Sequence, residues 1–405
     1  MTDVTTARPP AYPMTRDPDA PLDPPPDLCE LQERTPLTRV RLWDGSTPWL
    51  VTRYAEQRAL LADPRISADV KHPHYPHQGP AGRQWAADRR GFITLDDPEH
   101  ARLRRMVTAA FAIKQVERLR PAVQRIVDEL IDGLLAGDPH VDLVQAFSLP
   151  VPSQVICALL GVPYADHEFF QANTKTMLNR RSPVDEVAAA FGSLAGYVER
   201  LLGEKLVDPR DDLLSDLALR VAAGDLSLRD ATATAQLLLV AGHETTANMI
   251  ALGTLALLQH PEQLAVLRDT NDPKVVARAV EELLRYLTIV HSGRRRVALE
   301  DIEIAGETIR AGEGVILASD LGNRDPAAFA DPDRLDLRRD ARTHVAFGFG
   351  VHQCLGQPLA RLELQVVYGT LYRRIPTLRL DADLDEIPFK SDAVVYGVYA
   401  LPVTW

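Results

Sequence analysis

The segment FGFGVHQCLG, residues 347–356, decides the fold of this protein. It contains the pattern Phe-x-x-Gly-x-x-x-Cys-x-Gly, which runs from Phe347 and Gly350 to Cys354 and Gly356. The glycines permit tight turns and a close approach of the backbone. A helical sequence, QPLARLELQVV, follows at once, so Cys354 precedes a helix N-terminus, where a thiolate is stabilised. Such a thiolate could ligate iron; the alternative is a buried cysteine in a glycine-rich turn.

Length and composition exclude several classes of protein. The chain has 405 residues, of which 46% are hydrophobic and 25% charged, as in ordinary soluble globular proteins. A formal net charge of -11 disfavours nucleic-acid binding, because phosphates repel an acidic chain. Three widely separated cysteines argue against a disulfide framework and for a reducing cytoplasm. We find neither a signal peptide nor an apolar run of about 20 residues, so no membrane is expected.

The periodicity of the hydrophobic residues predicts a mainly α protein with a minor β portion. Residues 38–52 alternate polar and apolar side chains on both sides of Asp44-Gly45, which predicts a β-hairpin. Asp97 is expected to cap a helix that begins at Pro98. Short strands are expected after about residue 293. Further helices are expected at 115–136, 151–160, 165–178, 186–206, 210–222, 227–259, 273–286 and 357–374.

Two segments fall outside this regular pattern. Residues 1–30 form a proline-rich arm, for which we expect an extended strap on the surface, and residues 31–405 form one domain. The stretch from Ser67 to Phe92 is too long for an ordinary connection, which is typical of lids. It contains KHPHYPHQGP, residues 71–80, with three histidines. A zinc site is disfavoured there, because no cysteine or acidic ligand accompanies the histidines.

The segment around Cys354 resembles the haem-thiolate loop of cytochromes P450, in which a cysteine ligates the haem iron. The resemblance predicts further motifs, and all of them occur in the family's order over nearly the whole chain. These motifs are DDPEHARLRR with His100 and Arg104, AGHETT at 241–246, Glu282-Leu-Leu-Arg285, and NRDP at 323–326. The resemblance implies the cytochrome P450 fold, with haem b between the long central helix and the helix that follows the cysteine.

The central helix carries the residues expected to take part in the reaction. Leu238, Ala241 and either Glu244 or Thr245 recur at helical spacing and therefore share a stripe. Small Ala241 and Gly242 would let a flat cofactor approach the backbone. The Thr245 hydroxyl can bond a ligand or return to the Ala241 carbonyl. By resemblance, Glu244 and Thr245 are the acid and the alcohol that deliver protons; a solvated or ion-paired Glu244 is the alternative.

Haem carries two propionates, which need cations when they are buried. By resemblance these cations are His100, Arg104, Arg296 and His352, and His344 is a further candidate. The full cofactor-binding set implied is Cys354 as the metal ligand together with His100, Arg104, Arg296, His352, Phe347, Ala241 and Gly348. Glu282 and Arg285 are expected to form a structural ion pair. The substrate pocket and its lid are expected to include His72, Leu238, Ile289, Val290 and Val395.

The resemblance implies a soluble, actinobacterial monooxygenase that hydroxylates a C–H bond of a bulky apolar substrate with dioxygen. Electrons would come from a ferredoxin or flavodoxin with its reductase, and we expect a cytoplasmic monomer. Relatives of this type include hydroxylases of polyene macrolides such as filipin, so antibiotic biosynthesis is the expected setting. Steroid, vitamin D-like or xenobiotic substrates are the alternative. Two further hypotheses are a haem-binding sensor or carrier without turnover and an oxidation driven by peroxide.

Two surface features complete the predictions. One histidine of the tract at residues 71–80, with His72 as the first choice, is expected to swing towards the haem when substrate is absent. A solvated loop is the alternative for the whole tract. Arg102, Arg105 and Arg361 are expected to form a basic patch that steers an acidic ferredoxin, with scattered solvated arginines as the alternative.

Overall fold

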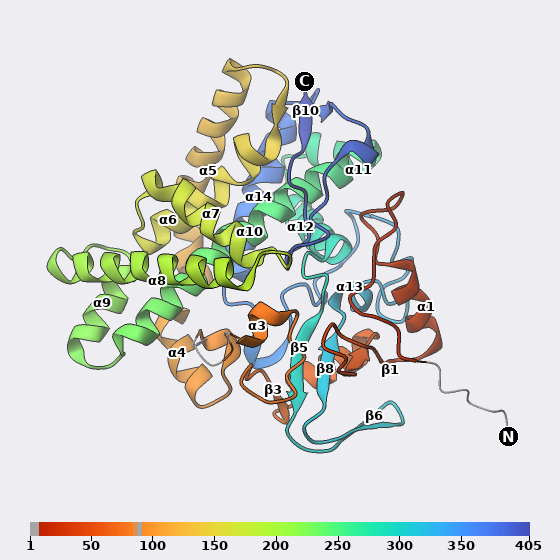
Figure 1. Ribbon diagram of the computed structural model, residues 1–405. Coiled ribbons are helices and arrows are strands. Elements are labelled where there is room, and N and C mark those ends of the chain that lie inside the picture. The colour runs from red at the N-terminus through yellow and green to blue at the C-terminus, as the bar shows by residue number, and fades with distance from the viewer. Residues whose placement is uncertain (1–7, 85, 87–90) are drawn as a thin grey trace.

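The computed structural model describes residues 8–84, 86 and 91–405. A large helical part is joined to a smaller part built on a β-sheet (Figure 1), which confirms the predicted fold class. The helices are α1 Pro26–Arg34, α2 Tyr54–Ala62, α3 Pro80–Gln84, α4 Glu99–Thr108, α5 Ile113–Ala136, α6 Pro150–Leu160, α7 His167–Leu178, α8 Val184–Val207, α9 Leu213–Ala223, α10 Leu228–Gln259, α11 Pro261–Arg268, α12 Pro273–Leu287, α13 Ser319–Gly322 and α14 Gln357–Arg374.

The main sheet has the strand order β1-β2-β8-β5-β3. Strands β1 and β2 form the predicted antiparallel hairpin around Asp44-Gly45, while β2 runs parallel to β8. Strand β5 is antiparallel to β8, with Arg296 opposite Val315. The strands are β1 Leu37–Arg39, β2 Trp49–Val51, β3 Ile66–Ser67, β4 Val141–Asp142, β5 Arg294–Ala298, β6 Ile302–Ile304, β7 Glu307–Ile309, β8 Gly314–Leu317, β9 Arg379–Leu380 and β10 Pro402–Thr404.

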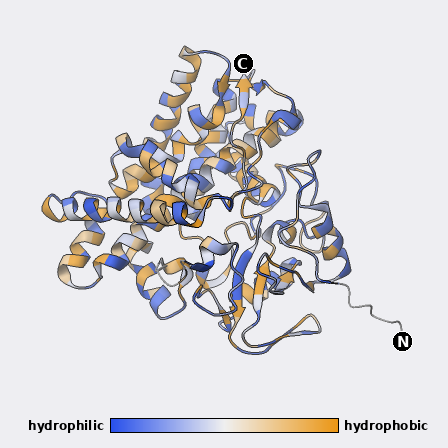
Figure 2. Cartoon of the chain, in the orientation of Figure 1, coloured by the Kyte–Doolittle hydropathy of each residue, from blue (hydrophilic) through white to orange (hydrophobic). Residues whose placement is uncertain are grey.

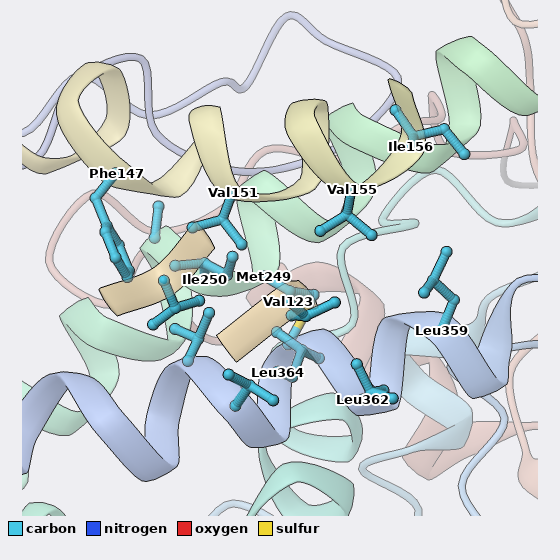
Figure 3. Close-up of a cluster of buried hydrophobic side chains, with 14 of the residues drawn as sticks. Val123, Phe147, Val151, Val155, Ile156, Met249, Ile250, Leu359, Leu362 and Leu364 are labelled. Atoms are coloured by element: carbon cyan, nitrogen blue, oxygen red, sulfur yellow. The ribbon is translucent and has the colours of Figure 1, made fainter. Parts of the chain in front are cut away.

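The main hydrophobic core lies where α5, α6, α10 and α14 pack together. Figure 3 shows Val155 of α6 and Leu362 of α14 on opposite sides of Met249 and Ile250 from α10. Hydrophobic residues are concentrated along these inner helices (Figure 2). Between residues 231 and 257 of α10, all of which the structure describes, Ala241 is the only exposed residue. The central helix is therefore buried or half-buried along most of its length, and Ala241 is its one solvent-exposed position in this range.

The predicted cap at Asp97 differs from the observed helix start. Helix α4 begins at Glu99, and Pro98 occupies the capping position with helical dihedral angles. The Asp97 carboxylate still accepts a hydrogen bond from the backbone N–H of Ala101 at 3.0 Å, and it also contacts His100. Asp97 therefore stabilises the first turn from just outside the helix.

The proline-rich arm is not the surface strap that we expected. Tyr12 and Leu22 are buried, and the backbone N–H of Tyr12 bonds the carbonyl of Arg41 at 2.9 Å. The Tyr396 hydroxyl donates to the Pro21 carbonyl at 2.8 Å, which ties the arm to the C-terminal part of the chain. The predicted boundary at residue 30 also falls inside α1. Apolar side chains within the arm explain the difference, because their burial outweighs the extended tendency of its prolines.

The long stretch between Ser67 and Phe92 is only partly irregular. It begins at the end of β3 and includes the short helix α3, which contacts α8. Residues 85 and 87–90 of the predicted loop lie outside the described residues.

Candidate active site

The cysteine loop joins the sheet part of the molecule to α14. The backbone N–H of Cys354 donates to the Phe347 carbonyl at 2.9 Å, which closes the loop. Gly348 and Gly350 have φ values of 75° and 72°, in the region that favours glycine. A Cβ atom on Gly350 would lie 2.2 Å from the Leu61 carbonyl oxygen of α2. These two glycines are therefore required by the backbone, as the sequence predicted.

The Cys354 thiol is exposed in the chain, although protein surrounds it on most sides. Burial raises the pKa of the Cys354 thiol, and the Gly356 N–H together with Arg294, Arg104 and Arg361 opposes that rise only in part. The protein alone thus favours the neutral thiol, whereas the sequence predicted a thiolate stabilised by the helix N-terminus. A coordinated metal cation would reverse this balance, because it deprotonates a ligating thiol.

Basic side chains surround this loop, as predicted for the propionate partners. The Arg104 guanidinium donates to the Gln353 carbonyl at 2.6 Å, which fastens α4 to the cysteine loop. The rings of His100 and His352 lie 4.1 Å apart between centroids. Burial, followed by the charges of Arg296, His100 and Arg104, lowers the pKa of His352 to about 3. His352 is therefore neutral at physiological pH.

The donors in this region fit an anionic cofactor. His100 is buried, and its Nε2 atom has no hydrogen-bond partner among the described residues. Arg296 is also buried, and neither Arg296 nor Arg104 forms an ion pair with any acidic side chain that the structure describes. Buried cations are stable only with an anionic or strongly polar partner. The propionates of haem would supply that partner, and Cys354 would ligate its iron.

His344 does not belong to this set of free donors. Its Nε2 atom contacts the Glu281 carboxylate at 3.1 Å, and its Nδ1 atom accepts the backbone N–H of Ala346 at 3.1 Å. Burial raises the pKa of Glu281, but hydrogen bonds from His344 and Arg361 outweigh it and lower the value to about 2. Both nitrogens of His344 are occupied, so it fixes the loop rather than a propionate.

One predicted catalytic residue, Thr245, lies one turn after the exposed Ala241 on α10. The Thr245 hydroxyl donates to the Ala241 carbonyl at 2.8 Å, which is the return bond that the sequence allowed. Gly242 does not share this face, because a Cβ atom there would lie 2.6 Å from Cδ1 of Ile156 on α6. The prediction that Gly242 admits the cofactor is therefore wrong. Its small size instead allows α6 and α10 to pack closely.

Glu244 is ion-paired, as in the alternative that the sequence left open. Its Oε1 atom lies 2.7 Å from Nζ of Lys390 and accepts a hydrogen bond from Nδ2 of Asn248 at 3.1 Å. Burial raises the pKa of Glu244, but Lys390, together with the smaller effects of His243 and Asn248, outweighs burial, so the pKa is lowered overall. No sequence signal indicated Lys390, because it lies far along the chain in a segment without a motif.

The predicted ion pair between Glu282 and Arg285 is confirmed. Nε of Arg285 lies 2.7 Å from the Glu282 carboxylate, and both side chains are fully buried. Arg285 also donates to the carbonyls of Asn323 and Pro332 at 2.8 Å, and Arg339 reaches the same carboxylate at 3.1 Å. This network holds the NRDP segment against α12.

The structure brings several of the predicted pocket residues together. The backbone N–H of Tyr396 donates to the Ile289 carbonyl at 2.8 Å, which places Val395 beside the Ile289–Val290 segment. Leu238 lies on α10 within the main core and is nearly buried. These residues come from α10, from the segment after α12 and from the C-terminal segment.

The histidine tract is fastened to the sheet through its backbone. The Arg295 guanidinium donates to the Pro76 carbonyl at 2.6 Å, and the Trp43 indole donates to the His77 carbonyl at 3.0 Å. His72 accepts the backbone N–H of His74 at 3.3 Å through Nδ1. The expected movement of His72 towards the haem remains a prediction.

The predicted basic patch is smaller than expected. Arg102 pairs with Glu99 at 3.1 Å and with Asp230 at 3.2 Å. Arg361 pairs with Glu281 at 2.7 Å. Arg105 is exposed and pairs with no acidic side chain among the described residues, so it alone keeps the predicted free charge.

Comparison with known proteins defines the class to which this site belongs. A model of the cytochrome P450 family matches residues 199–377. The chain belongs to the cytochrome P450 family: it is a monooxygenase whose cofactor is haem b. Within the part of the chain that the structure describes, no helix combines the length and apolar character needed to cross a membrane.

Among similar proteins, cytochrome P450 GfsF of Streptomyces halstedii is 56% identical over 398 residues, covering 98% of this chain and 96% of that protein. The GfsF crystal structure gives a TM-score of 0.92 and covers 98% of this chain and 100% of that chain. The crystal structure of the mycinamicin VIII C21 methyl hydroxylase MycCI of Micromonospora griseorubida, bound to mycinamicin VIII, gives a TM-score of 0.92 at 41% sequence identity. The match covers 98% of this chain and 100% of that chain. Vitamin D3 dihydroxylase of Streptomyces griseolus is 45% identical over 98% of this chain and 97% of that protein.

Proposed function

We propose that this monooxygenase hydroxylates a C–H bond of a bulky apolar secondary metabolite, with a polyene macrolide such as filipin as the first candidate. The observation that carries the proposal is the Cys354 loop, with its unpaired cations, in a chain whose α10 is exposed at Ala241. The similarity to MycCI, a methyl hydroxylase of mycinamicin VIII, supports hydroxylation of a metabolite. Vitamin D-like substrates are the second candidate, because a vitamin D3 dihydroxylase is 45% identical.

When bound, haem supplies dioxygen activation and the insertion of one oxygen atom into the substrate. In this proposal Cys354 ligates its iron, and His100, Arg104, Arg296 and His352 hold the propionates beside Phe347 and Gly348. Ala241, the exposed position of α10, would leave room for the cofactor. Thr245 presents a hydroxyl, and Glu244 is the acid of the pair. Substrate would be positioned by Leu238, Ile289, Val290, Val395 and the lid residue His72.

The proposal extends to the surroundings of the enzyme. Residues 31–405 form the haem domain, and the buried side chains Tyr12 and Leu22 of the preceding arm pack against it. A ferredoxin or flavodoxin with its reductase supplies the electrons, and the protein works as a cytoplasmic monomer. A haem sensor without turnover would need neither Thr245 nor a carboxylate such as Glu244 beside it. NADPH-dependent product with a surrogate ferredoxin system separates the enzyme from the sensor.

The test of the site is the absorption spectrum of the reduced protein with carbon monoxide. Wild type is expected to show the band of thiolate-ligated haem, and Cys354→Ser is expected to lose it while the chain stays folded. Cys157→Ser is a matched control, because Cys157 is buried in the core away from the loop. A wild-type spectrum typical of histidine-ligated haem would contradict the proposal. Difference spectra with macrolide and secosteroid panels then rank the two substrate classes.

A further inference from the structure

The three consecutive arginines of β5 differ in their surroundings. Side chains alternate across a strand, so Arg294 and Arg296 share one face and Arg295 points to the other. Arg295 donates to the Pro76 carbonyl, and its guanidinium lies 6.0 Å from the centre of the Tyr12 ring. Arg294 lies instead on the side of the cysteine loop, together with the predicted propionate partner Arg296.

Arg294 is fastened to the start of the cysteine loop. Its Nη2 atom donates to the Ala346 carbonyl at 2.6 Å, and Nη1 bonds the Ser319 hydroxyl. A Cβ atom on Gly348 would lie 3.0 Å from Nε of Arg294, so the guanidinium lies directly against the loop backbone. Ala346 and Gly348 flank Phe347, whose carbonyl receives the N–H of Cys354. One side chain therefore spans the sheet, α13 and the loop.

The charge of Arg294 has no acidic partner within the described residues. By accessible surface the side chain is half-buried, and burial, with the charge of Arg296 adding to it, lowers its pKa to about 10. A guanidinium that is partly desolvated needs an anion close by. The anions that this site would contain are the thiolate and the propionates.

We infer that Arg294 is a further residue of the haem site, which clamps the start of the cysteine loop and raises the reduction potential of the bound haem. A fixed positive charge stabilises the ferrous state, which carries one electron more than the ferric state. Because surrounding charges and hydrogen bonds set such potentials, the cation also governs how readily the first electron is accepted. The inference rests on the proposed ligation by Cys354.

The experiment compares the midpoint potential of the substrate-free holoenzyme in three variants. Arg294→Gln removes the charge, Arg294→Lys keeps the charge but loses the planar fork, and Arg295→Gln removes an equal charge from the opposite face of β5. Arg294→Gln is expected to disfavour reduction about tenfold or more, a shift of ~59 mV to more negative potential for one electron. Arg295→Gln is expected to shift the potential much less. Equal shifts in the two glutamine variants, or none in Arg294→Gln, would overturn the inference.

If Arg294→Gln fails to take up haem, Arg294→Lys still tests the effect of the charge and of the clamp separately. It is expected to retain a potential close to that of wild type but to release haem faster to an excess of apomyoglobin, because the clamp on Ala346 is lost. A tenfold effect on reduction in Arg294→Lys contradicts the role of charge, and unchanged haem release contradicts the clamp. A wild-type carbon monoxide spectrum without the thiolate band overturns Cys354 ligation and this inference together.

Discussion

At the scale of single residues, the least expected contact is the one between Glu244 and Lys390. Oε1 of Glu244 lies 2.7 Å from Nζ of Lys390. The Glu244 side chain is only 16% exposed and the Lys390 side chain only 12%. The groups that face the carboxylate are Lys390, the Asn248 amide, His243 and Tyr399. Only Lys390 carries a positive charge at neutral pH, since burial lowers the pKa of His243. Lys390 therefore decides whether Glu244 stays ionised.

The first prediction at this scale concerns Lys390→Met. Without the cation, burial is the largest remaining influence on Glu244, ahead of the opposing effects of His243 and Asn248, and we expect it to raise the pKa above the usual value of roughly 4.3. Product formed per electron consumed is expected to fall as the pH drops towards this raised pKa, by at least several-fold, whereas the wild-type profile stays flat. The free energy of unfolding should also depend on pH. In the wild type, the ion pair stabilises the folded state at pH values above the usual pKa of a glutamate, and this stabilisation is lost as the pH falls through the lowered pKa of Glu244.

Two matched variants complete that experiment. Lys390→Arg is expected to restore the flat pH profile, because it returns a cation to the same place. Lys205→Met removes another enclosed ion pair, with Asp212 just before α9, and is expected to leave the profile unchanged. A Lys390→Met profile identical to wild type would show that Glu244 does not deliver protons.

The sequence pattern indicated Cys354 and its basic neighbours as site residues. It could not show which of several identical neighbouring side chains faces the site. Residues 294–296 are three consecutive arginines, which the sequence alone does not distinguish. The alternation of side chains along β5 places Arg294 on the side of the cysteine loop. Helical spacing indicated a stripe that contains Ala241, but it left open which neighbour faces α6, where Gly242 contacts Ile156. Lys390 could not be found, since its partner belongs to a distant helix.

At the scale of elements, the C-terminal segment 389–398 connects the central helix with the chain between α7 and α8. The backbone N–H of Val394 donates to the Leu178 carbonyl at 2.9 Å, and that of Arg180 donates to the Asp392 carbonyl at 2.8 Å. On its other side, Gly397 packs against Asn248 of α10. This segment therefore contacts both the α7–α8 connection and the central helix that carries Glu244.

Gly397→Ala tests the close packing of this segment against α10. A Cβ atom on Gly397 would lie 1.7 Å from Oδ1 of Asn248, so the segment must move away from the helix. We expect a loss of stability of about 1–3 kcal/mol and weaker substrate binding. Gly192→Ala on α8 is the control, since its Cβ would meet no atom within 4 Å and a helical alanine is favoured by about 0.5–1 kcal/mol. Equal melting temperatures in the two variants would contradict the packing.

The elements themselves were predicted well because local signals agree with burial. Helix α10 spans Leu228–Gln259, against the predicted 227–259, and Ser227 caps it by accepting the Asp230 N–H. The arm was predicted badly, because proline content describes backbone preference and not the burial of Tyr12 in a core with Leu50 and Ile316. Contacts between segments far apart in sequence decide such cases, and a single sequence does not contain them.

At the scale of the whole molecule, the proposed haem site draws on both parts of the protein. The helical part supplies α4, α10 and α14, and the sheet part supplies β5 and the segment that leads to the cysteine loop (Figure 1). The loop reaches the surface at Val351, which is 60% exposed. Arg104 ties α4 to this loop, and the exposed Arg105 follows it in the same helix. An electron donor would therefore dock on this face.

The final prediction is that Arg105 steers that donor, since Arg102 and Arg361 are already neutralised by ion pairs. Arg105→Glu is expected to slow electron transfer from an acidic ferredoxin by roughly twofold or more at low ionic strength, with a smaller effect in high salt. Arg379→Glu changes the net charge equally but lies on β9, which pairs with β10. In Figure 1, β10 lies at the opposite end of the molecule from α4. Stopped-flow reduction over a salt series measures both variants. If Arg379→Glu slows the reaction as much as Arg105→Glu, only net charge matters and the donor has no preference for the cysteine-loop face.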